Sequence, residues 1–290
     1  MRLRTAPVLA GLLTAIPVYA QDAVQLKIMY AAGQRRIVHS RAHIDIDLKI
    51  KNLQDTESLL NIKTTRSEEF LEEILEADAD GNFRSRVRCT ASSIDSIEGT
   101  KPQQSTKGPL LDRTLTVSRR GAEYAVNAEE GAISEGEAAR IGRWHDIEAL
   151  LPSKPVKLKD SWDAPAGFIT LLFKDVPIKN PGDVKVTFIE LTQGAGGSQV
   201  AVLSLAAHIQ TENKPGQPGK EMSIKTLSAD LTGSLSIDLA AARPVGCSLS
   251  GSLAVSGEVA DERETKVGTI KGESEKLSFD LSFEPVAPGQ

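Results

Sequence analysis

The feature that most constrains this fold is the alternation of apolar and polar side chains between residues 38 and 50. One set reads Val38, Ser40, Ala42, Ile44, Ile46, Leu48 and Ile50, and the other reads His39, Arg41, His43, Asp45, Asp47 and Lys49. Side chains of a β-strand point alternately to the two faces of a sheet, so this period of two predicts a long strand with one buried face.

The same alternation recurs along the chain, at 83–94, 184–191, 200–209, 231–239, 247–259 and 277–283. Loop compositions rich in Gly, Pro, Asn and Gln separate several of these runs, at 193–197, 213–219 and 243–246. Strands that follow one another through such loops, without helices between them, favour an antiparallel meander.

Helical signals are concentrated in residues 134–151. Ser134 and Glu137 form a capping-box pattern, apolar side chains follow at helical spacing, and Pro152 stops the helix. Residues 167–173 fit either a short helix or a buried strand, and the acidic run at 70–75 is interpreted as a strand with a short helix as the alternative. The predicted fold is therefore mainly β: a long curved antiparallel sheet or open barrel with one principal α-helix, at about 134–151, packed on it.

The first twenty residues carry Arg2 and Arg4, a short apolar run, and small residues before a cleavage point after Ala20. This pattern predicts a signal peptide over residues 1–20 and export to the periplasm or the medium. The predicted organisation continues with one β-rich domain over 21–284, a possible subdivision near 130–165, and a flexible tail over 285–290. No later apolar run approaches the ~20 residues of a membrane span.

Charge argues against some partners. The net charge is −5, and loss of Arg2 and Arg4 takes it to −7. A mildly acidic chain without a basic patch is a poor candidate for binding nucleic acid or an anionic membrane.

Residues 76–82 resemble a calcium-binding loop, with Asp78, Asp80 and Asn82 at alternate positions. Counted from Asp78, however, position 6 is Phe83 instead of Gly, and position 12 is Cys89 instead of the closing Glu. A hairpin turn at Asp80-Gly81 fits better.

Catalytic patterns are weak elsewhere. His39 and His43 are too far apart on a strand to share one metal ion. His145 lies beside Asp146, but the chain has neither a Gly-x-Ser-x-Gly nor a Ser-x-x-Lys nucleophile motif. We therefore expect no enzyme, no cofactor and no metal site, with a hydrolase that uses scattered acids (Asp146, Asp160, Asp163) as the remaining enzymatic alternative.

The chain has two cysteines, Cys89 and Cys247, both on predicted apolar strand faces. Export would permit a disulfide. Either a disulfide between them or two separate buried thiols is consistent with the sequence, because the distance between the residues decides.

Several segments together resemble a group of uncharacterised exported bacterial proteins. They are the predicted strand 24–30 with Gly33, the turn at 78–81, residues 150–156 leading to Asp160-Ser-Trp162, and residues 233–238. The resemblance covers most of the chain after residue 20 and implies no established activity. A long curved antiparallel sheet with a helix against it also resembles the bacterial lipoprotein carriers, which hold acyl chains on a concave apolar face.

These observations predict a non-enzymatic exported protein that binds an apolar or lipid-like ligand in a concave sheet. The alternative is a structural or interaction protein of the cell envelope. The expected lining is the apolar helix face and the segment after it: Ile141, Trp144, Ile147, Leu151, Trp162, Phe168, Leu172 and Phe173.

Overall fold

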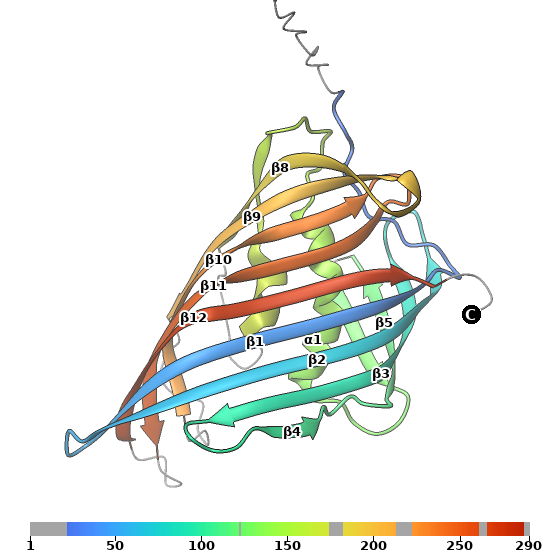
Figure 1. The fold of residues 1–290 in the computed structure, drawn as a ribbon. Helices are drawn as coiled ribbons and strands as arrows, with labels where there is room; N and C mark the ends of the chain where they lie inside the picture. The colour runs from blue at the N-terminus through green and yellow to red at the C-terminus, as the bar shows by residue number, and fades with distance from the viewer. Residues whose placement is uncertain (1–21, 122, 174–181, 213–221, 261–265, 287–290) are drawn as a thin grey trace, which may run out of the picture.

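The computed structural model describes residues 22–121, 123–173, 182–212, 222–260 and 266–286. One antiparallel sheet of twelve strands dominates it (Figure 1). The strands are β1 (Arg35–Asn52), β2 (Glu57–Ala77), β3 (Phe83–Glu98), β4 (Gln104–Lys107), β5 (Thr114–Arg120), β6 (Glu123–Ala128), β7 (Ser161–Pro165), β8 (Asp183–Gln193), β9 (Gln199–Glu212), β10 (Met222–Asp238), β11 (Arg243–Ala260) and β12 (Lys266–Pro285). The predicted β class and all seven alternating runs are confirmed.

The sheet consists of two meanders joined by the terminal strands. Its order is β6-β5-β3-β2-β1-β12-β11-β10-β9-β8-β7, with β4 pairing only with β3. The junction is the antiparallel β1·β12 pair, which runs from Arg36 opposite Pro285 to Asn52 opposite Gly268. In the described part of the chain, β6 and β7 remain the two edges, so the sheet is open and does not close into a barrel.

Four helical segments lie between or beside the strands: α1 (Glu135–Arg143) and the 3₁₀ segments η1 (Trp144–Leu150), η2 (Ala166–Phe173) and η3 (Ala195–Gly197). At the start of α1, Ser134 Oγ accepts from the amide of Glu137 at 3.3 Å, as the capping-box pattern predicted. The prediction of a single α-helix over 134–151 is wrong in one respect, because the chain tightens to 3₁₀ geometry at Trp144. The three-residue repeat of that geometry turns Trp144, Ile147 and Leu150 to one side, and all three are buried.

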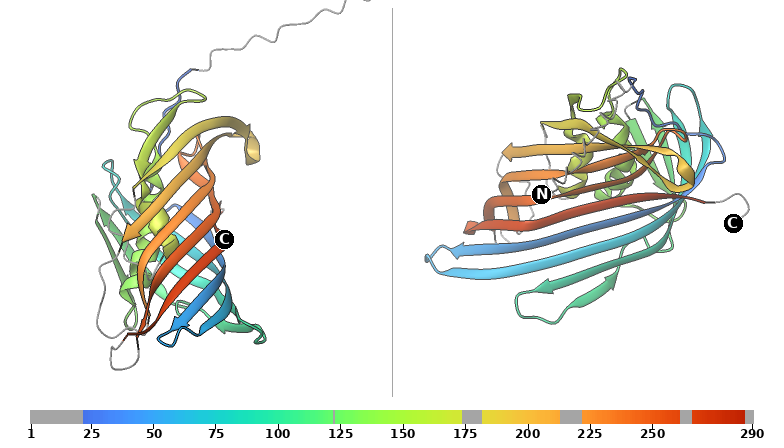
Figure 2. Two further views of the ribbon diagram at one scale, coloured as in Figure 1. Left: turned by 90° about the vertical axis from the view of Figure 1, so that its left-hand side faces the viewer. Right: turned by 45° about the horizontal axis from the view of Figure 1, so that its top comes forward.

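The helical layer lies against one face of the sheet, and the sheet curves around it (Figures 1 and 2). We call this the inner face and the opposite one the outer face. Register shifts at Asp45/Asp47 in the β1·β12 pair and at Glu69/Phe70 in the β2·β3 pair mark bulges, which increase local twist. Gly142 lets α1 approach β6 closely, since a Cβ there would lie 3.1 Å from Tyr124 Cβ.

The run at 70–75 is part of β2, so the strand interpretation is confirmed and the helical alternative is wrong. The segment 24–30 corrects another expectation: it forms one isolated bridge, Val24 to Val156, instead of a strand. Its Leu26 and Ile28 are buried in the core. The segment 167–173 belongs to η2, so the helical alternative holds there.

At the C-terminus, β12 continues to Pro285, and the amide of Val286 donates to Arg35 O at 3.1 Å. The predicted signal peptide and residues 287–290 of the predicted tail lie outside the described residues. Among the described helices, none is long and apolar enough to span a membrane.

Candidate functional site

The apolar residues expected to line a ligand site are mostly packed between the sheet and the helical layer. Ile141, Trp144, Ile147 and Phe168 are buried, while Leu151 and Trp162 are half-buried. The Trp144 ring lies edge-on to Phe70 of β2, with centroids 5.0 Å apart. The side chains of Leu172 and Phe173 lie outside the described residues. The structure therefore brings the described members of this set together as core packing around the helices.

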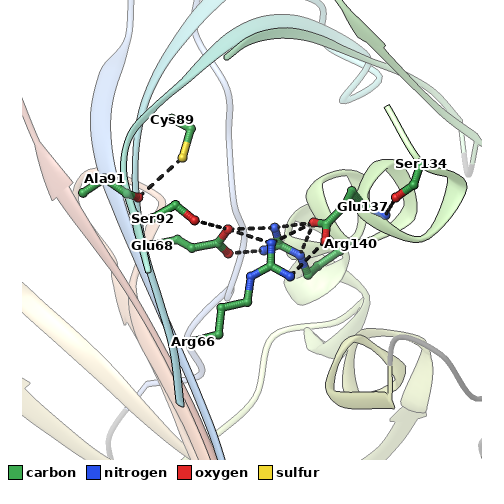
Figure 3. Close-up of polar contacts among 8 residues, drawn as sticks. All are labelled: Arg66, Glu68, Cys89, Ala91, Ser92, Ser134, Glu137 and Arg140. Atoms are coloured by element: carbon green, nitrogen blue, oxygen red, sulfur yellow. Dashed lines mark hydrogen bonds and ion pairs between the residues drawn. The ribbon is translucent and has the colours of Figure 1, made fainter. Parts of the chain in front are cut away.

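Two groups of buried charges hold the helical layer on β2, and neither was predicted. The first, the four-charge cluster, comprises Arg66 and Glu68 of β2 with Glu137 and Arg140 of α1 (Figure 3). The Arg66 guanidinium donates to both Glu137 carboxylate oxygens at 2.9 Å and to Glu68 Oε1 at 2.8 Å. Arg140 lies 2.6 Å from Glu68 Oε2 and 2.7 Å from Glu137 Oε2.

The four-charge cluster is electrically balanced and almost dry. The side chains of Glu68 and Glu137 are only 1% and 4% exposed. Burial would lower the pKa of Arg66, but its bonds to Glu137 and Glu68 outweigh burial and raise that pKa. Ser92 of β3 donates a further bond to Glu68 Oε1 at 3.2 Å (Figure 3). Because desolvation of such charges is costly, the arrangement specifies how α1 sits on the sheet more than it adds net stability.

The second group, the His145 cluster, comprises Arg36 of β1, Glu72 of β2, His145 of η1 and Tyr30. Arg36 Nε donates to Glu72 Oε2 at 2.7 Å, and His145 Nε2 lies 3.1 Å from Glu72 Oε1. Burial would raise the pKa of Glu72, but Arg36 and His145 hold it well below its usual range. Burial lowers the pKa of His145 despite the neighbouring Glu72. Burial likewise raises the pKa of Tyr30.

The sequence did carry a signal for both clusters. Alternation within β2 places Arg66, Glu68, Phe70, Glu72 and Ile74 on the inner face, so acids occupy positions where apolar residues are expected. Direct pairing confirms this arrangement, because Phe70 and Glu72 lie opposite Val38 and Arg36 of β1. When acidic residues fall on the buried face of a strand, each carboxylate must be paired with a basic side chain. Such a pattern therefore predicts buried ion pairs.

Beyond the helices, the inner face of the long strands is apolar and partly open. The 21 residues of β2 span about 70 Å, whereas α1 and η1 together measure about 28 Å, so these helices cannot cover the strands from end to end. The ends of β1 and β2 extend past the helices (Figure 1).

Seven half-buried apolar side chains lie on this part of the inner face, past the described helices, and we call them the distal strip: Ile44, Ile50, Leu60, Ile62, Ile224, Val255 and Val259. The pairing of β2, β1, β12, β11 and β10 confirms that these seven side chains lie on one face of the sheet. One row of paired residues crosses five strands as Leu60, Leu48, Gly272, Val255 and Leu227. Directly paired residues point to the same side of a sheet. At the middle of this row, a Cβ on Gly272 would lie 2.5 Å from Leu48 Cδ2, so neighbouring side chains already close over the glycine.

The outer face carries a pocket of 840 Å³ across β10, β11, β12, β1, β2 and β3. Its lining includes none of the eight predicted lining residues, and is rich in small hydroxyl side chains: Ser67, Ser234, Ser236, Ser248 and Ser282. His39 is held here between two carboxylates, with its ring nitrogens 3.6 Å from Glu69 and 3.6 Å from Glu284. The pocket is therefore a shallow, hydroxyl-rich and charge-paired surface.

The calcium-like stretch is a turn, as predicted. Asp78 Oδ1 accepts from the amides of Asp80 at 2.9 Å and Asn82 at 3.0 Å, and Asn82 Nδ2 donates to Asp78 Oδ2 at 2.8 Å. Gly81 has a φ of 80°. The Asp78 oxygens are thus occupied by the turn. Within the described ranges, no group of three or more His, Cys, Asp or Glu side chains is placed to hold a metal ion.

The remaining acidic candidates do not gather at one place. Asp146 lies in η1, whereas Asp163 is exposed on β7. Asp160 Oδ2 accepts from the amide of Lys157 at 2.8 Å and so closes a turn.

Cys89 and Cys247 are separate buried thiols in the structure. They lie on β3 and β11, with β2, β1 and β12 between these strands. Four interstrand spacings amount to about 19 Å along the sheet, against an upper limit of about 7 Å between the Cα atoms of a disulfide. Burial raises the pKa of each thiol to about 12.

Comparisons with known proteins leave the chain without a family. No protein-family model matches it, and no curated protein matches it. Among solved structures, it is similar to a chain from a study of lipid–protein interactions in lipovitellin, with 10% sequence identity and a TM-score of 0.41. That alignment covers 90% of this chain and 26% of the lipovitellin chain, so this chain spans about a quarter of its length. What is established of this chain is an open, curved, mainly antiparallel β-sheet with a charge-clamped helical layer on its inner face.

Proposed function

We propose that this protein is an exported, non-enzymatic binder of an apolar, lipid-like ligand, and that the distal strip receives the ligand. The observation that carries the proposal is the distal strip, a set of half-buried apolar side chains on the inner face past the described helices. A completed core would bury these side chains, whereas a binding surface leaves them accessible to a ligand. Export is supported by the signal-like first twenty residues.

The dimensions of the distal strip suit an extended acyl chain. Along β1, the distance from Ile44 to Ile50 is about 20 Å, and the five strands from β2 to β10 span about 19 Å. The paired row Leu60, Leu48, Gly272, Val255 and Leu227 carries no charged side chain. Leu48 and Leu227 of this row are buried, so Leu60 and Val255 are its accessible apolar side chains. A chain of methylene groups laid on this surface would gain about 0.8 kcal/mol for each group removed from water.

The helical layer has a supporting role in this proposal. Arg66 and Glu68 lie four and six residues along β2 from Ile62 of the distal strip, on the same face of the sheet. By fixing α1 over the other half of the inner face, the four-charge cluster keeps the layer from sliding onto the distal strip. An envelope interaction protein remains the competing function.

The first experiment is native mass spectrometry of the protein purified from its own host without detergent. We expect extra mass that organic solvent removes. A clean mass of the chain alone, together with failure to bind a fluorescent long-chain fatty acid in buffer, would contradict the proposal and favour the envelope interaction protein.

A matched pair of variants locates the site. Val255→Thr introduces a hydroxyl into the distal strip at nearly constant volume, whereas Val245→Thr makes the same change at an exposed position of the same strand, β11. We expect Val255→Thr to weaken binding of the fluorescent fatty acid by about fivefold, the equivalent of ~1 kcal/mol, and Val245→Thr to leave it unchanged. Equal effects of the two variants would remove the distal strip from the proposal.

A further inference from the structure

The β1–β2 hairpin carries the most exposed large apolar side chains of the described part of the chain. Leu53 is 64% exposed and Leu59 is 73% exposed. The hairpin projects beyond the rest of the sheet in two views (Figures 1 and 2). We call residues 49–60 the hairpin tip. Exposed apolar side chains that gather at one protruding point are typical of an interaction site.

The hairpin tip carries apolar side chains on both faces of the sheet, although the outer face also bears Lys49, Lys51 and Glu57. Leu59 pairs with Lys49 on the outer face, while Leu60 pairs with Leu48 on the inner face. Leu53 lies in the turn between the strands. A partner protein would cover mainly one side of such a hairpin, whereas lipid chains surround an inserted tip on every side. Two-sided apolarity therefore favours a bilayer over a protein surface.

The turn satisfies four of its own backbone amides, which bears on the second requirement for entering lipid. Asn52 Oδ1 accepts from the amides of Gln54 and Thr56, both at 2.9 Å. The amide of Asp55 donates to Asn52 O at 3.1 Å, and the amide of Asn52 donates to Thr56 O at 3.0 Å. These internal bonds lower the cost of moving the turn out of water.

Charge indicates which lipid surface fits. Between residues 49 and 59 the charged side chains are Lys49, Lys51, Asp55 and Glu57, which sum to zero. Lys51 Nζ also lies 3.0 Å from Asp55 Oδ1. A hairpin tip with no net charge and an internal ion pair gains no binding energy from anionic headgroups. The long side chains of Lys49 and Lys51 can keep their ammonium groups at the interface while Leu53 and Leu59 enter the bilayer.

We propose that the hairpin tip docks this protein on a zwitterionic lipid bilayer by inserting Leu53 and Leu59 at the interface. The distal strip begins directly behind these residues, at Ile50 and Leu60. The inserted residues, Leu53 and Leu59, are not part of the distal strip, so membrane docking and ligand binding can fail separately.

The test is flotation of the chain with vesicles of phosphatidylcholine, and with vesicles of phosphatidylcholine plus phosphatidylglycerol. The probe variant is Leu53→Ser with Leu59→Ser. The matched control is Ile189→Ser with Val245→Ser, which removes two other exposed apolar side chains, 47% and 39% exposed, from β8 and β11. All four positions are exposed, so we expect all variants to keep the melting temperature of the wild type.

We expect the wild type to float with both vesicle types, the probe variant to partition about tenfold more weakly, and the control to match the wild type. Fatty-acid binding in buffer should be equal in all three proteins. A wild type that stays in buffer with both vesicles overturns the docking proposal, as does a probe variant that floats like the wild type. Binding that appears only with phosphatidylglycerol would also overturn it, because it would be electrostatic.

A spectroscopic measurement checks the orientation. Leu59→Cys and, as the control, Ile189→Cys are labelled with an environment-sensitive dye, while Cys89 and Cys247 are buried in the folded chain. We expect phosphatidylcholine vesicles to shift the emission at position 59 to the blue and to leave position 189 unchanged. Equal shifts, or a shift only at position 189, would contradict insertion of the hairpin tip.

Discussion

Neutralising Glu68 tests whether the four-charge cluster holds the helical layer on the sheet. Glu68→Gln keeps the size of the side chain and an acceptor for Ser92, but removes a negative charge whose side chain is only 1% exposed. Arg66 and Arg140 would then face the single carboxylate of Glu137. Removing one partner of a buried pair typically costs about 3–5 kcal/mol. Because Glu137 still contacts both guanidinium groups, we expect a loss of about 3 kcal/mol, at the lower end of that range.

Urea unfolding followed by circular dichroism measures this loss as a change in the free energy of unfolding. Glu69→Gln is the matched control, since it is the next residue of β2 but points to the outer face, where its side chain is 40% exposed. We expect the control to stay within about 0.5 kcal/mol of the wild type.

A double-mutant cycle separates electrostatics from packing. Adding Arg140→Gln to Glu68→Gln restores a neutral cluster of Arg66 and Glu137, so the double variant should lose about 2 kcal/mol less than the sum of the single losses. The reasoning would be refuted by a Glu68→Gln loss below about 1 kcal/mol, or by single losses that add to within about 0.5 kcal/mol.

Two further measurements address the buried titratable groups. His145 has a lowered pKa in the folded chain, so below its ordinary value of 6.5 the unfolded chain binds the additional proton, and stability should fall with falling pH by up to about 1.4 kcal/mol per unit. Glu72, also lowered, should add a second loss below its ordinary 4.5. Between pH 4 and 8, the free energy of unfolding of the wild type should fall below about pH 6.5, whereas that of His145→Gln should not. A loss of stability that persists in His145→Gln would contradict its assignment to His145. A thiol reagent should find no reactive cysteine in the folded chain and two after unfolding without reductant, because Cys89 and Cys247 are buried and unbonded; two thiols that appear only after reduction would show a disulfide instead.

Much of the architecture was predictable from local patterns. The alternation along 38–50 and its recurrences predicted the strands, because the period of side-chain direction is a local property of extended backbone. Ser134 and Glu137 predicted where α1 begins, and Asp78 with Gly81 predicted the turn between β2 and β3, because both depend on bonds within a few residues.

The sequence alone predicted the curved sheet, and it selected the candidate lining residues by their apolar size. Trp144 and Phe168 were selected for their apolar size, and the structure uses both to fill the space beneath the helices. The distal strip was already visible as the alternation of Ile44 and Ile50. Its partial exposure, however, depends on how far the helical layer extends, which no local pattern reports.

By itself the sequence determined seven of the twelve strands and part of β2, together with the start of α1 and the turn between β2 and β3, because short-range sterics and hydrogen bonds decide these. Only the tertiary structure decided that β1 pairs with β12, that Glu68 meets Arg140 and Glu72 meets His145, and that three strands separate the strand of Cys89 from that of Cys247. These contacts join residues far apart in the chain, and they are selected by the burial and charge balance of the whole sheet and its helical layer.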